Sequence, residues 1–393
     1  MLTDSQRAIV KSTVPLLESG GEALVTHFYR MLLRDYPQVA PLFNKAHQSS
    51  GAQPRALANG LLMYARHIDR LDQLGDLVGA IVSKHVALQI LPEHYPMVGD
   101  CLLRAIREVL GAEIATDAVL EAWGAAYGQL AGILIGLEKK VYDEKEQAAG
   151  GWRGARLFTV LRKQRESDEI TSFYFEAKDG QPLLAYQAGQ FIGLSVTVGG
   201  EEMRRQYSLS SAGDGRHYRI SVKREPGGKV SNYLHDDIHE GSEIALFPPS
   251  GEFTLAPNGK PLLLISGGVG ITPMLAMLEA ALPGGRPIVF IHAARHAGVH
   301  AFRDKIDALA ARHPQLKRFF CYGEARPQDP PPHATGLLDA GRLRAWMPDS
   351  TDVDAYFVGP KPFMRAIKQY LEEIGVPAAQ SRHEFFGPAS ALD

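Results

Sequence analysis

Apolar side chains recur at the three-and-four spacing of amphipathic helices throughout the first 148 residues, and no alternating strand pattern interrupts them. Thr3 caps a first predicted helix that ends at the Gly20–Gly21 pair, and Pro37 ends a second one. Four further helices are predicted over 56–68, 74–90, 94–110 and 120–145. Three glycines in the stretch 148–154 then mark a linker.

Two other patterns follow the linker. Between Arg156 and Asn258, Gly, Pro and Asp turns separate short apolar segments, a spacing typical of a small antiparallel β-barrel. From Pro261 onward, apolar strands alternate with amphipathic helices, as in a doubly wound parallel sheet. The sequence therefore predicts a multidomain chain, with an all-α domain over 1–148, an antiparallel barrel over 149–258 and an α/β domain over 259–393.

A lone histidine lies on the apolar face of the predicted helix 74–90. His85 shares the helical spacing of Val78, Ile81 and Leu88, so its ring points where the aliphatic side chains point. A buried imidazole needs a partner. Two interpretations stay open here: a core histidine bonded to a backbone carbonyl, or a metal ligand that the rest of the chain encloses.

Composition narrows the range of partners. The chain of 393 residues carries 42 Lys plus Arg against 44 Asp plus Glu, so it has no large basic field for nucleic acid or an anionic membrane, and a small molecule is the expected partner. Its two cysteines exclude a disulfide framework and a multi-cysteine metal site. The N-terminus lacks an apolar signal core, and apolar runs such as PLLLISGGVGI are short of a membrane span. We expect a cytoplasmic monomer without obligatory membrane contact.

The stretch LLLISGGVGITPM, residues 262–274, joins a buried strand to a glycine-rich turn and a helix. Glycine lets the backbone approach a pyrophosphate closely, and the helix start offers free N–H groups to it. The pattern indicates a nucleotide site formed by Gly267, Gly268, Val269, Gly270, Ile271, Thr272 and Pro273.

A second candidate site lies in the barrel segment RRQYSLSS. One interpretation is an exposed strand with a solvated arginine. The other is a flavin-binding site. In it, Arg205 pairs with the diphosphate, Tyr207 lies against the isoalloxazine, and the Ser208 hydroxyl reaches the reactive nitrogen of the flavin. The segment VKREPGGKVSNYLH supplies another phosphate-binding turn with Gly228, Val230 and Ser231.

The order of RQYS, GGKVSNYL, GGVGITP and EFFGP resembles the ferredoxin–NADP reductase superfamily. The resemblance implies that the barrel holds FAD and that the last domain holds NADH or NADPH. Further FAD contacts implied by it are Gln206 and Tyr186, and a tail that closes over the flavin, formed by Phe385, Phe386, Gly387 and Pro388. Since flavin can release the electrons of a hydride singly, a one-electron acceptor is expected nearby.

With its helical first domain, the whole chain resembles the bacterial and yeast flavohaemoglobins. The resemblance implies that His85 is the proximal ligand of haem b iron and that Phe43 wedges the haem. It further implies a distal pocket of Tyr29, Gln53 and Leu57, a pair behind the histidine formed by Tyr95 and Glu138, and residues that tune electron passage, Lys84 and Glu384.

Taken singly, these residues have plainer interpretations. Tyr29 and Phe43 suit ordinary core positions, Gln53 suits a helix start, and Glu138 suits a solvated face beside two lysines. Lys84 and Glu384 are equally compatible with simple surface charges. Their occurrence in this order, upstream of a flavin reductase, favours the haem assignment.

The function implied by the resemblance is nitric oxide dioxygenase: NAD(P)H reduces FAD, FAD reduces haem b, and O2 at the haem converts NO to nitrate. The alternatives are a gas-sensing haem protein and a general flavin reductase for quinones or ferric chelates. Arg295 leaves the choice between NADH and NADPH open, because it suits either a 2′-phosphate or solvent. Two departures are Pro54, which requires the distal helix to begin close to Gln53, and Val358, where the family usually carries cysteine.

Overall fold

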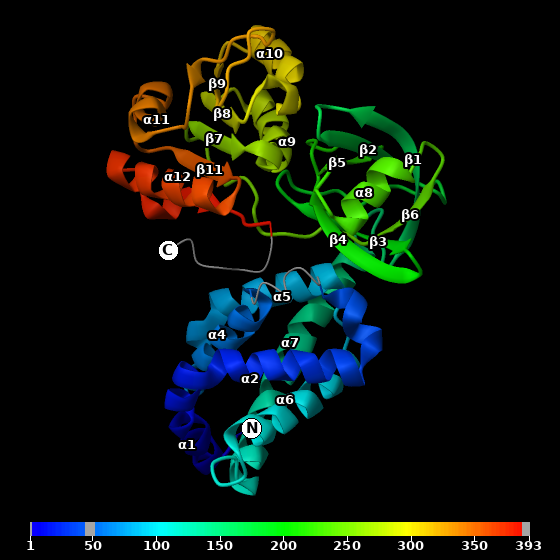
Figure 1. The fold of residues 1–393 in the computed structure, drawn as a ribbon, viewed down its shortest axis with the longest axis vertical. Helices are drawn as coiled ribbons and strands as arrows, with labels where there is room; N and C mark the ends of the chain where they lie inside the picture. The colour runs from blue at the N-terminus through cyan, green and yellow to red at the C-terminus, as the bar shows by residue number, and fades with distance from the viewer. Residues whose placement is uncertain (1, 44–51, 387–393) are drawn as a thin grey trace. The chain divides into compact units, whose positions relative to one another are not determined.

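The computed structural model describes residues 2–43 and 52–386, and the chain divides into two compact units (Figure 1). The main segment of the first unit ends at Gln147, and that of the second begins at Ala148. The fold class predicted from the sequence is confirmed: a helical unit is followed by an antiparallel sheet and then by a parallel sheet.

The first unit is helical throughout its described residues. Its elements are α1 Asp4–Ser12, α2 Val14–Asp35, η1 Pro37–Leu42, α4 Ala52–Arg66, η2 Leu71–Leu74, α5 Gly75–Leu88, α6 His94–Leu110 and α7 Asp117–Gln147. Thr3 caps α1 as predicted, because its side chain accepts from the N–H of Gln6 while Gln6 bonds back to it. α2 packs against both α4 and α6 and brings Phe28, Met31 and Leu32 into the core (Figure 1).

The predicted helix end at the Gly20–Gly21 pair is wrong. α1 ends at Ser12, and α2 begins at Val14 and continues through both glycines. Pro15 lies in the first turn of α2, where its missing N–H leaves no helical bond unmade, so it starts a helix instead of breaking one. A Cβ on Gly21 would lie 3.6 Å from the Cβ of Ala58 on α4, which is an ordinary van der Waals distance.

Among the described residues, α7 is one helix that is long and apolar enough to cross a membrane, by length and composition only. The sequence-based expectation that apolar runs fall short of a span overlooked it. Trp123 and Ala126 of α7 lie in the helical core, and Glu138 is also buried. A buried core helix can pass the same test of length and composition, so the test alone does not show that α7 crosses a membrane.

The second unit begins with a six-stranded antiparallel sheet in the order β4-β3-β6-β1-β2-β5. An isolated bridge joins Leu209, directly after β4, to Ile220 of β5, so the two edge strands curl toward each other in the manner of a barrel. One short helix that the sequence analysis missed lies in this region. The elements are β1 Arg156–Arg165, β2 Ile170–Ala177, β3 Phe191–Val198, β4 Glu201–Ser208, β5 Tyr218–Lys223, α8 Lys229–Asp236 and β6 Glu243–Leu246.

A six-stranded parallel sheet in the order β10-β9-β8-β7-β11-β12 completes this unit. Its strand order reverses between β7 and β11, and ligands of open α/β sheets bind at such a switch point. Residues of α9 and α10 pack on one face, and residues of α11 and α12 pack on the other (Figure 1). The elements are β7 Leu262–Gly267, η3 Gly268–Gly270, α9 Ile271–Ala281, η4 Leu282–Gly284, β8 Ile288–Ala294, η5 Ala297–Val299, α10 Arg303–Arg312, β9 Leu316–Tyr322, β10 Ala334–Thr335, α11 Ala340–Trp346, β11 Asp354–Val358, α12 Lys361–Ile374, η6 Ala378–Gln380 and β12 Ser381–His383.

Candidate functional site

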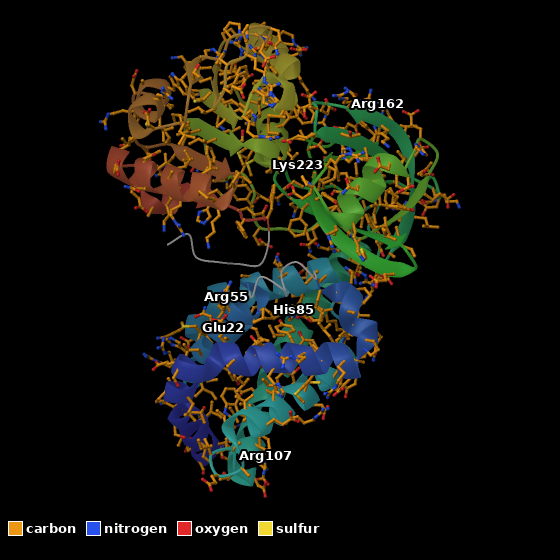
Figure 2. The ribbon with its side chains drawn as sticks, viewed as in Figure 1. Glu22, Arg55, His85, Arg107, Arg162 and Lys223 are labelled. Atoms are coloured by element: carbon orange, nitrogen blue, oxygen red, sulfur yellow. The ribbon has the colours of Figure 1, made fainter. Side chains whose placement is uncertain are left out.

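His85 lies in the last turn of α5, labelled in Figure 2. The helix ends there because Gln89 adopts a left-handed conformation, with φ 59°, and the N–H of Ile90 turns back to the carbonyl of His85 at 2.9 Å. Lys84 precedes His85 and is exposed. The ring of His85 is therefore held at the C-terminal end of α5.

A buried carboxylate and a phenol meet the ring of His85. Its Nδ1 lies 2.7 Å from Oε1 of Glu138 and 3.1 Å from the hydroxyl of Tyr95, which donates to the same Oε1 at 2.5 Å. Burial, reinforced by Glu138, raises the pKa of the Tyr95 hydroxyl, so it stays a donor. Glu138 is only 2% exposed, which overturns the interpretation as a solvated charge.

This geometry leaves the other nitrogen of His85 available. The carboxylate holds the proton on Nδ1, and Nε2 makes no hydrogen bond to the residues that the structure describes. A histidine whose outer N–H meets a carboxylate is the arrangement that orients a metal ligand and raises its basicity. The residues thus fit an iron bound at Nε2.

Two tyrosines that the sequence analysis missed complete the network. The Tyr142 hydroxyl donates to the carbonyl of Ile90 at 2.8 Å, and the Tyr127 hydroxyl donates to the carbonyl of Tyr95 at 2.7 Å. Tyr142 follows Glu138 by one turn on the buried face of α7. That spacing was the signal in the sequence that could have pointed to it.

On the predicted distal side, Tyr29 of α2 is buried, and its ring meets that of Phe43 edge to face with centroids 5.5 Å apart. Leu57 of α4 packs against the same core. As described, α4 begins at Ala52, so Pro54 falls in its first turn, as the sequence requires. The side chain of Gln53 lies outside the described part of the structure.

The flavin-site candidates Arg205, Gln206, Tyr207 and Ser208 form the end of β4. Because side chains alternate along a strand, Arg205 and Tyr207 share one face, and Gln206 and Ser208 share the other. Burial lowers the pKa of Arg205 and raises that of Tyr207. The amide nitrogen of Gln206 is buried with no hydrogen-bond partner among the described residues, and a polar group of a bound cofactor would satisfy it.

Four further candidates, Tyr186, Gly228, Val230 and Ser231, lie in the same unit. The Tyr186 hydroxyl donates to the carbonyl of Ser211 at 2.8 Å, and burial raises its pKa to about 12. Gly228 precedes α8 without any side-chain cap, so the first N–H groups of the helix are open to a phosphate. Val230 and Ser231 lie buried in the first turn of that helix.

The nucleotide-site candidates lie at the switch point of the parallel sheet. Gly268 has φ +54°, and a Cβ on Gly270 would lie 2.2 Å from the carbonyl oxygen of Val358 at the end of β11. Only glycine permits η3 to approach the end of β11 this closely. Gly267 ends β7, Val269 lies in η3, and α9 starts with Ile271, Thr272 and Pro273, all buried.

The C-terminal candidates are only partly described. Glu384 follows β12, Phe385 packs against the core beside α11 and α12, and Phe386 is 44% exposed. Gly387 and Pro388 lie outside the described residues. Arg295 donates to Glu169, in the turn between β1 and β2, at 2.5 Å, and its side chain is 69% exposed, which agrees with the interpretation as a cation in solvent.

Comparison with known proteins assigns each region to a family. Residues 26–134 match Globin, residues 157–255 match the oxidoreductase FAD-binding domain, and residues 264–369 match the oxidoreductase NAD-binding domain. A flavohemoprotein of Burkholderia sp. is 69% identical over 393 residues, with both chains fully covered. The chain belongs to the flavohemoprotein family. A flavohemoprotein of Pseudomonas aeruginosa is 64% identical, also with both chains fully covered.

Solved structures agree with this family fold. Flavohemoglobin from Malassezia yamatoensis, with bound FAD and heme, has a TM-score of 0.86 at 24% identity, covering 98% of this chain and all of its own. At that identity it shows the fold. The flavohem-like FAD/NAD-binding domain of nitric oxide dioxygenase from Vibrio cholerae is 36% identical, with a TM-score of 0.56, covering 60% of this chain and all of its own.

Proposed function

We propose that this flavohemoprotein is an NAD(P)H-dependent oxidoreductase that acts as a nitric oxide dioxygenase with haem b, FAD and NADH or NADPH. The observation that carries the proposal is the pairing of His85 Nδ1 with the buried Glu138, which readies Nε2 for iron in a globin joined to a flavin and nicotinamide module. When bound, the nicotinamide supplies hydride, the flavin passes single electrons, and the haem is where O2 and NO yield nitrate.

The chain's own residues bind and orient these groups. Arg205 and the open end of α8 hold the FAD diphosphate, Tyr207 on the same face of β4 lies against its ring system, and the Ser208 hydroxyl reaches the ring from the end of the strand. Gln206 supplies a donor for FAD, and the Tyr186 phenol packs at the site's edge. The turn from Gly267 to Pro273 receives the nicotinamide cofactor's pyrophosphate.

The distal residues form the pocket in which O2 and NO react. Tyr29 donates a hydrogen bond where negative charge develops on oxygen, with Gln53 as helper, and Phe43 and Leu57 keep the pocket apolar. On the proximal side, Tyr95 keeps Glu138 oriented toward His85. The distal hydrogen bond from Tyr29 and the basicity that Glu138 gives to His85 together favour electron density on a ligand bound to the iron.

Other parts of the proposal concern the chain as a whole. We assign domain boundaries after residue 148 and after residue 258. Lys84 and Glu384 tune electron passage, and Phe385, Phe386, Gly387 and Pro388 cover the flavin. The protein acts as a cytoplasmic monomer without obligatory membrane contact.

The test is consumption of NO at an electrode under air. We expect NAD(P)H-dependent NO consumption with nitrate as product, and turnover far above any reduction of quinones or ferric chelates. His85→Gly should abolish it, and added imidazole should restore part of it by taking the place of the lost ring. His27→Gly is the matched control, since His27 lies in the same unit and bonds Glu108 instead.

Binding of NO without turnover would instead identify a sensor. Turnover of ferric chelates that exceeds NO consumption would identify a general flavin reductase. Either result overturns the dioxygenase assignment while leaving the cofactor assignment standing.

A further inference from the structure

Arg295 follows β8 directly, at the carboxyl edge of the parallel sheet. Its backbone continues the pairing of β8 with β9, since the N–H of Glu324 donates to the carbonyl of Arg295 at 2.8 Å. In a doubly wound sheet, the glycine-rich turn after one strand binds the pyrophosphate, and the end of the next strand lies beside the adenosine ribose. β7 and β8 are two such neighbouring strands, so Arg295 is placed to meet that ribose.

A carboxylate from another part of the second unit already binds Arg295. Glu169 lies in the turn between β1 and β2, and its Oε2 accepts from Nη2 of Arg295 at 2.5 Å. The Glu169 side chain is 17% exposed, whereas that of Arg295 is 69% exposed. An ion pair with one partner this exposed contributes little to stability. Its effect on the charge beside β8 therefore matters more than its effect on the fold.

The turn that carries Glu169 is held on two sides. The N–H of Arg224, directly after β5, donates to the carbonyl of Glu169 at 2.7 Å. The N–H of Asp168 donates to the carbonyl of Gly298 in η5 at 2.8 Å, which ties the turn to the segment after β8. Because these bonds belong to the backbone, a change of the Glu169 side chain should leave the turn in place.

Two more cations of these segments are also paired. Arg165 binds Asp168 at 2.8 Å within the turn, and Arg326 lies 3.8 Å from Glu324 after β9. Together with the pair at Arg295, they form three ion pairs that carry no net charge. These side chains therefore offer no excess of positive charge to a phosphate.

NADH and NADPH differ only at the adenosine ribose. NADH has a neutral 2′-hydroxyl there, whereas NADPH has a 2′-phosphate, which carries about −1.5 to −2 charge at pH 7. To pair with that phosphate, Arg295 must leave Glu169, and the carboxylate is then left beside a like charge. A repulsion of this kind discriminates against the ligand that brings the charge. The neutral hydroxyl of NADH meets no such repulsion.

We propose that Glu169 is a specificity-determining residue. By neutralising Arg295 and repelling a 2′-phosphate, it makes the flavin accept hydride from NADH in preference to NADPH. The role of Glu169 rests on the proposed function in one respect, that a nicotinamide cofactor binds at the turn from Gly267 to Pro273. It is independent of the reaction at the haem.

The test is anaerobic stopped-flow reduction of the flavin in the full-length holoprotein, which requires neither O2 nor NO. The ratio of the second-order rate constants for NADH and NADPH measures the preference, and we expect the wild type to favour NADH. Glu169→Gln should raise the NADPH rate constant by roughly tenfold, the size of one charge–charge interaction near a protein surface. The rate constant for NADH should change far less, because the 2′-hydroxyl is neutral. Glu176→Gln makes the same change at the exposed, opposite end of β2 and should keep the wild-type ratio.

Arg295→Ala changes the other partner and covers the case in which Glu169→Gln fails to fold. It leaves the carboxylate without its cation, so the NADPH rate constant should fall by roughly tenfold. The double variant with Glu169→Gln and Arg295→Ala should lose the gain of Glu169→Gln, because no cation remains there for the phosphate. High salt should also reduce that gain by screening. A merely structural role of the pair would instead change both coenzymes alike.

A wild-type NADH-to-NADPH ratio in folded Glu169→Gln or Arg295→Ala would overturn the proposal. So would a wild-type protein that favours NADPH. If the ratio shifts as expected but NO is not consumed under air, the role of Glu169 is supported and the dioxygenase assignment alone fails. A flavin that neither coenzyme reduces in the wild type would overturn the nicotinamide site, and the role of Glu169 with it.

Discussion

Glu138 carries a carboxylate in the interior of a helical unit, and such a group is stable only when hydrogen bonds compensate for its lost hydration. Two donors do so, His85 Nδ1 and the Tyr95 hydroxyl, and both reach the same oxygen. The imidazole consequently gains electron density at Nε2. The pair therefore stabilises a buried charge, and in the proposed function it also sets how strongly His85 donates electron density to the iron.

We expect Glu138→Gln to weaken this donation without removing haem, because an amide oxygen accepts the Nδ1 proton less strongly than a carboxylate. The ferrous iron–histidine stretching frequency in resonance Raman spectra should fall, and NO turnover should slow. Glu144→Gln on the exposed side of α7 is the control and should match the wild type. A frequency unchanged in Glu138→Gln would contradict the proximal role.

On the distal side, we expect Tyr29→Phe to retain haem and FAD but to release O2 roughly ten- to a hundredfold faster. A hydrogen bond to a charged acceptor contributes about 1.5–3 kcal/mol, which corresponds to that range. Stopped-flow measurement of O2 dissociation tests it. Tyr36→Phe, whose hydroxyl bonds Asp100, should leave the rate unchanged. Equal rates for Tyr29→Phe and wild type would remove Tyr29 from the distal site.

The sequence indicated His85 because a lone polar ring interrupts an apolar helix face, and the family resemblance supplied Tyr95 and Glu138. It did not indicate Tyr127 and Tyr142. Their hydroxyls bond backbone carbonyls. Helical spacing from Glu138 places Tyr142 on the buried face of α7 but does not identify its acceptor, because the carbonyl of Ile90 lies just beyond the end of α5, which the left-handed Gln89 sets. The acceptor of Tyr127 lies in the first turn of α6.

Among the elements, long periodic segments were predictable and short ones were not. α5, α6 and α7 follow from apolar spacing sustained over several turns. α8 and α11 were missed because segments of 8 and 7 residues hold too few turns for a period to show. The predicted helix end at the glycine pair was wrong because packing of α2 against α4 and α6 outweighed the low helix propensity of Gly20 and Gly21.

The turn between β7 and α9 allows an element-scale prediction. Gly270→Ala would place a Cβ against the carbonyl of Val358, so η3 must shift by about 1 Å, a displacement that can slow a positioned reaction by roughly a hundredfold. We expect flavin reduction by NAD(P)H in anaerobic stopped-flow to slow to that extent. Reduction by dithionite and CO binding should remain normal.

Gly284→Ala serves as the control for this change, because no atom lies within 4 Å of its Cβ position. It should reduce flavin at the wild-type rate. If Gly270→Ala does the same, the turn tolerates a side chain and the close approach to β11 has no role in cofactor binding.

At the scale of the whole molecule, the order of the three folds was predictable because each has its own hydrophobic period: helical in the first unit, alternating in the barrel, and strands alternating with helices in the last region. What the sequence did not indicate is where polar groups end up buried. His292 of β8 and His300 lie with ring centroids 4.3 Å apart, and their Nδ1 atoms bond the hydroxyls of Ser266 and Tyr322.

Because these two histidines are buried, we expect the stability of the second unit to fall at acid pH. Burial lowers the pKa of His292 to about 3, and burial, His292 and Arg303 hold the pKa of His300 well below its usual value. The unfolded chain therefore binds more protons below pH 6.5, so stability is full above that pH and falls as the pH drops. Between pH 7.5 and 5.5 each ring should remove about 1.4 kcal/mol from the free energy of unfolding.

The measurement is the urea midpoint of the transition that releases the flavin, recorded by flavin fluorescence at both pH values. His292→Phe keeps a buried ring that cannot be protonated, and it should reduce the loss between pH 7.5 and 5.5 by about 1.4 kcal/mol, since the contribution of one ring is removed. His239→Phe makes the same change at an exposed histidine and should leave the loss unchanged. An equal loss in His292→Phe and wild type would mean that the pair does not set the acid sensitivity of this part of the molecule.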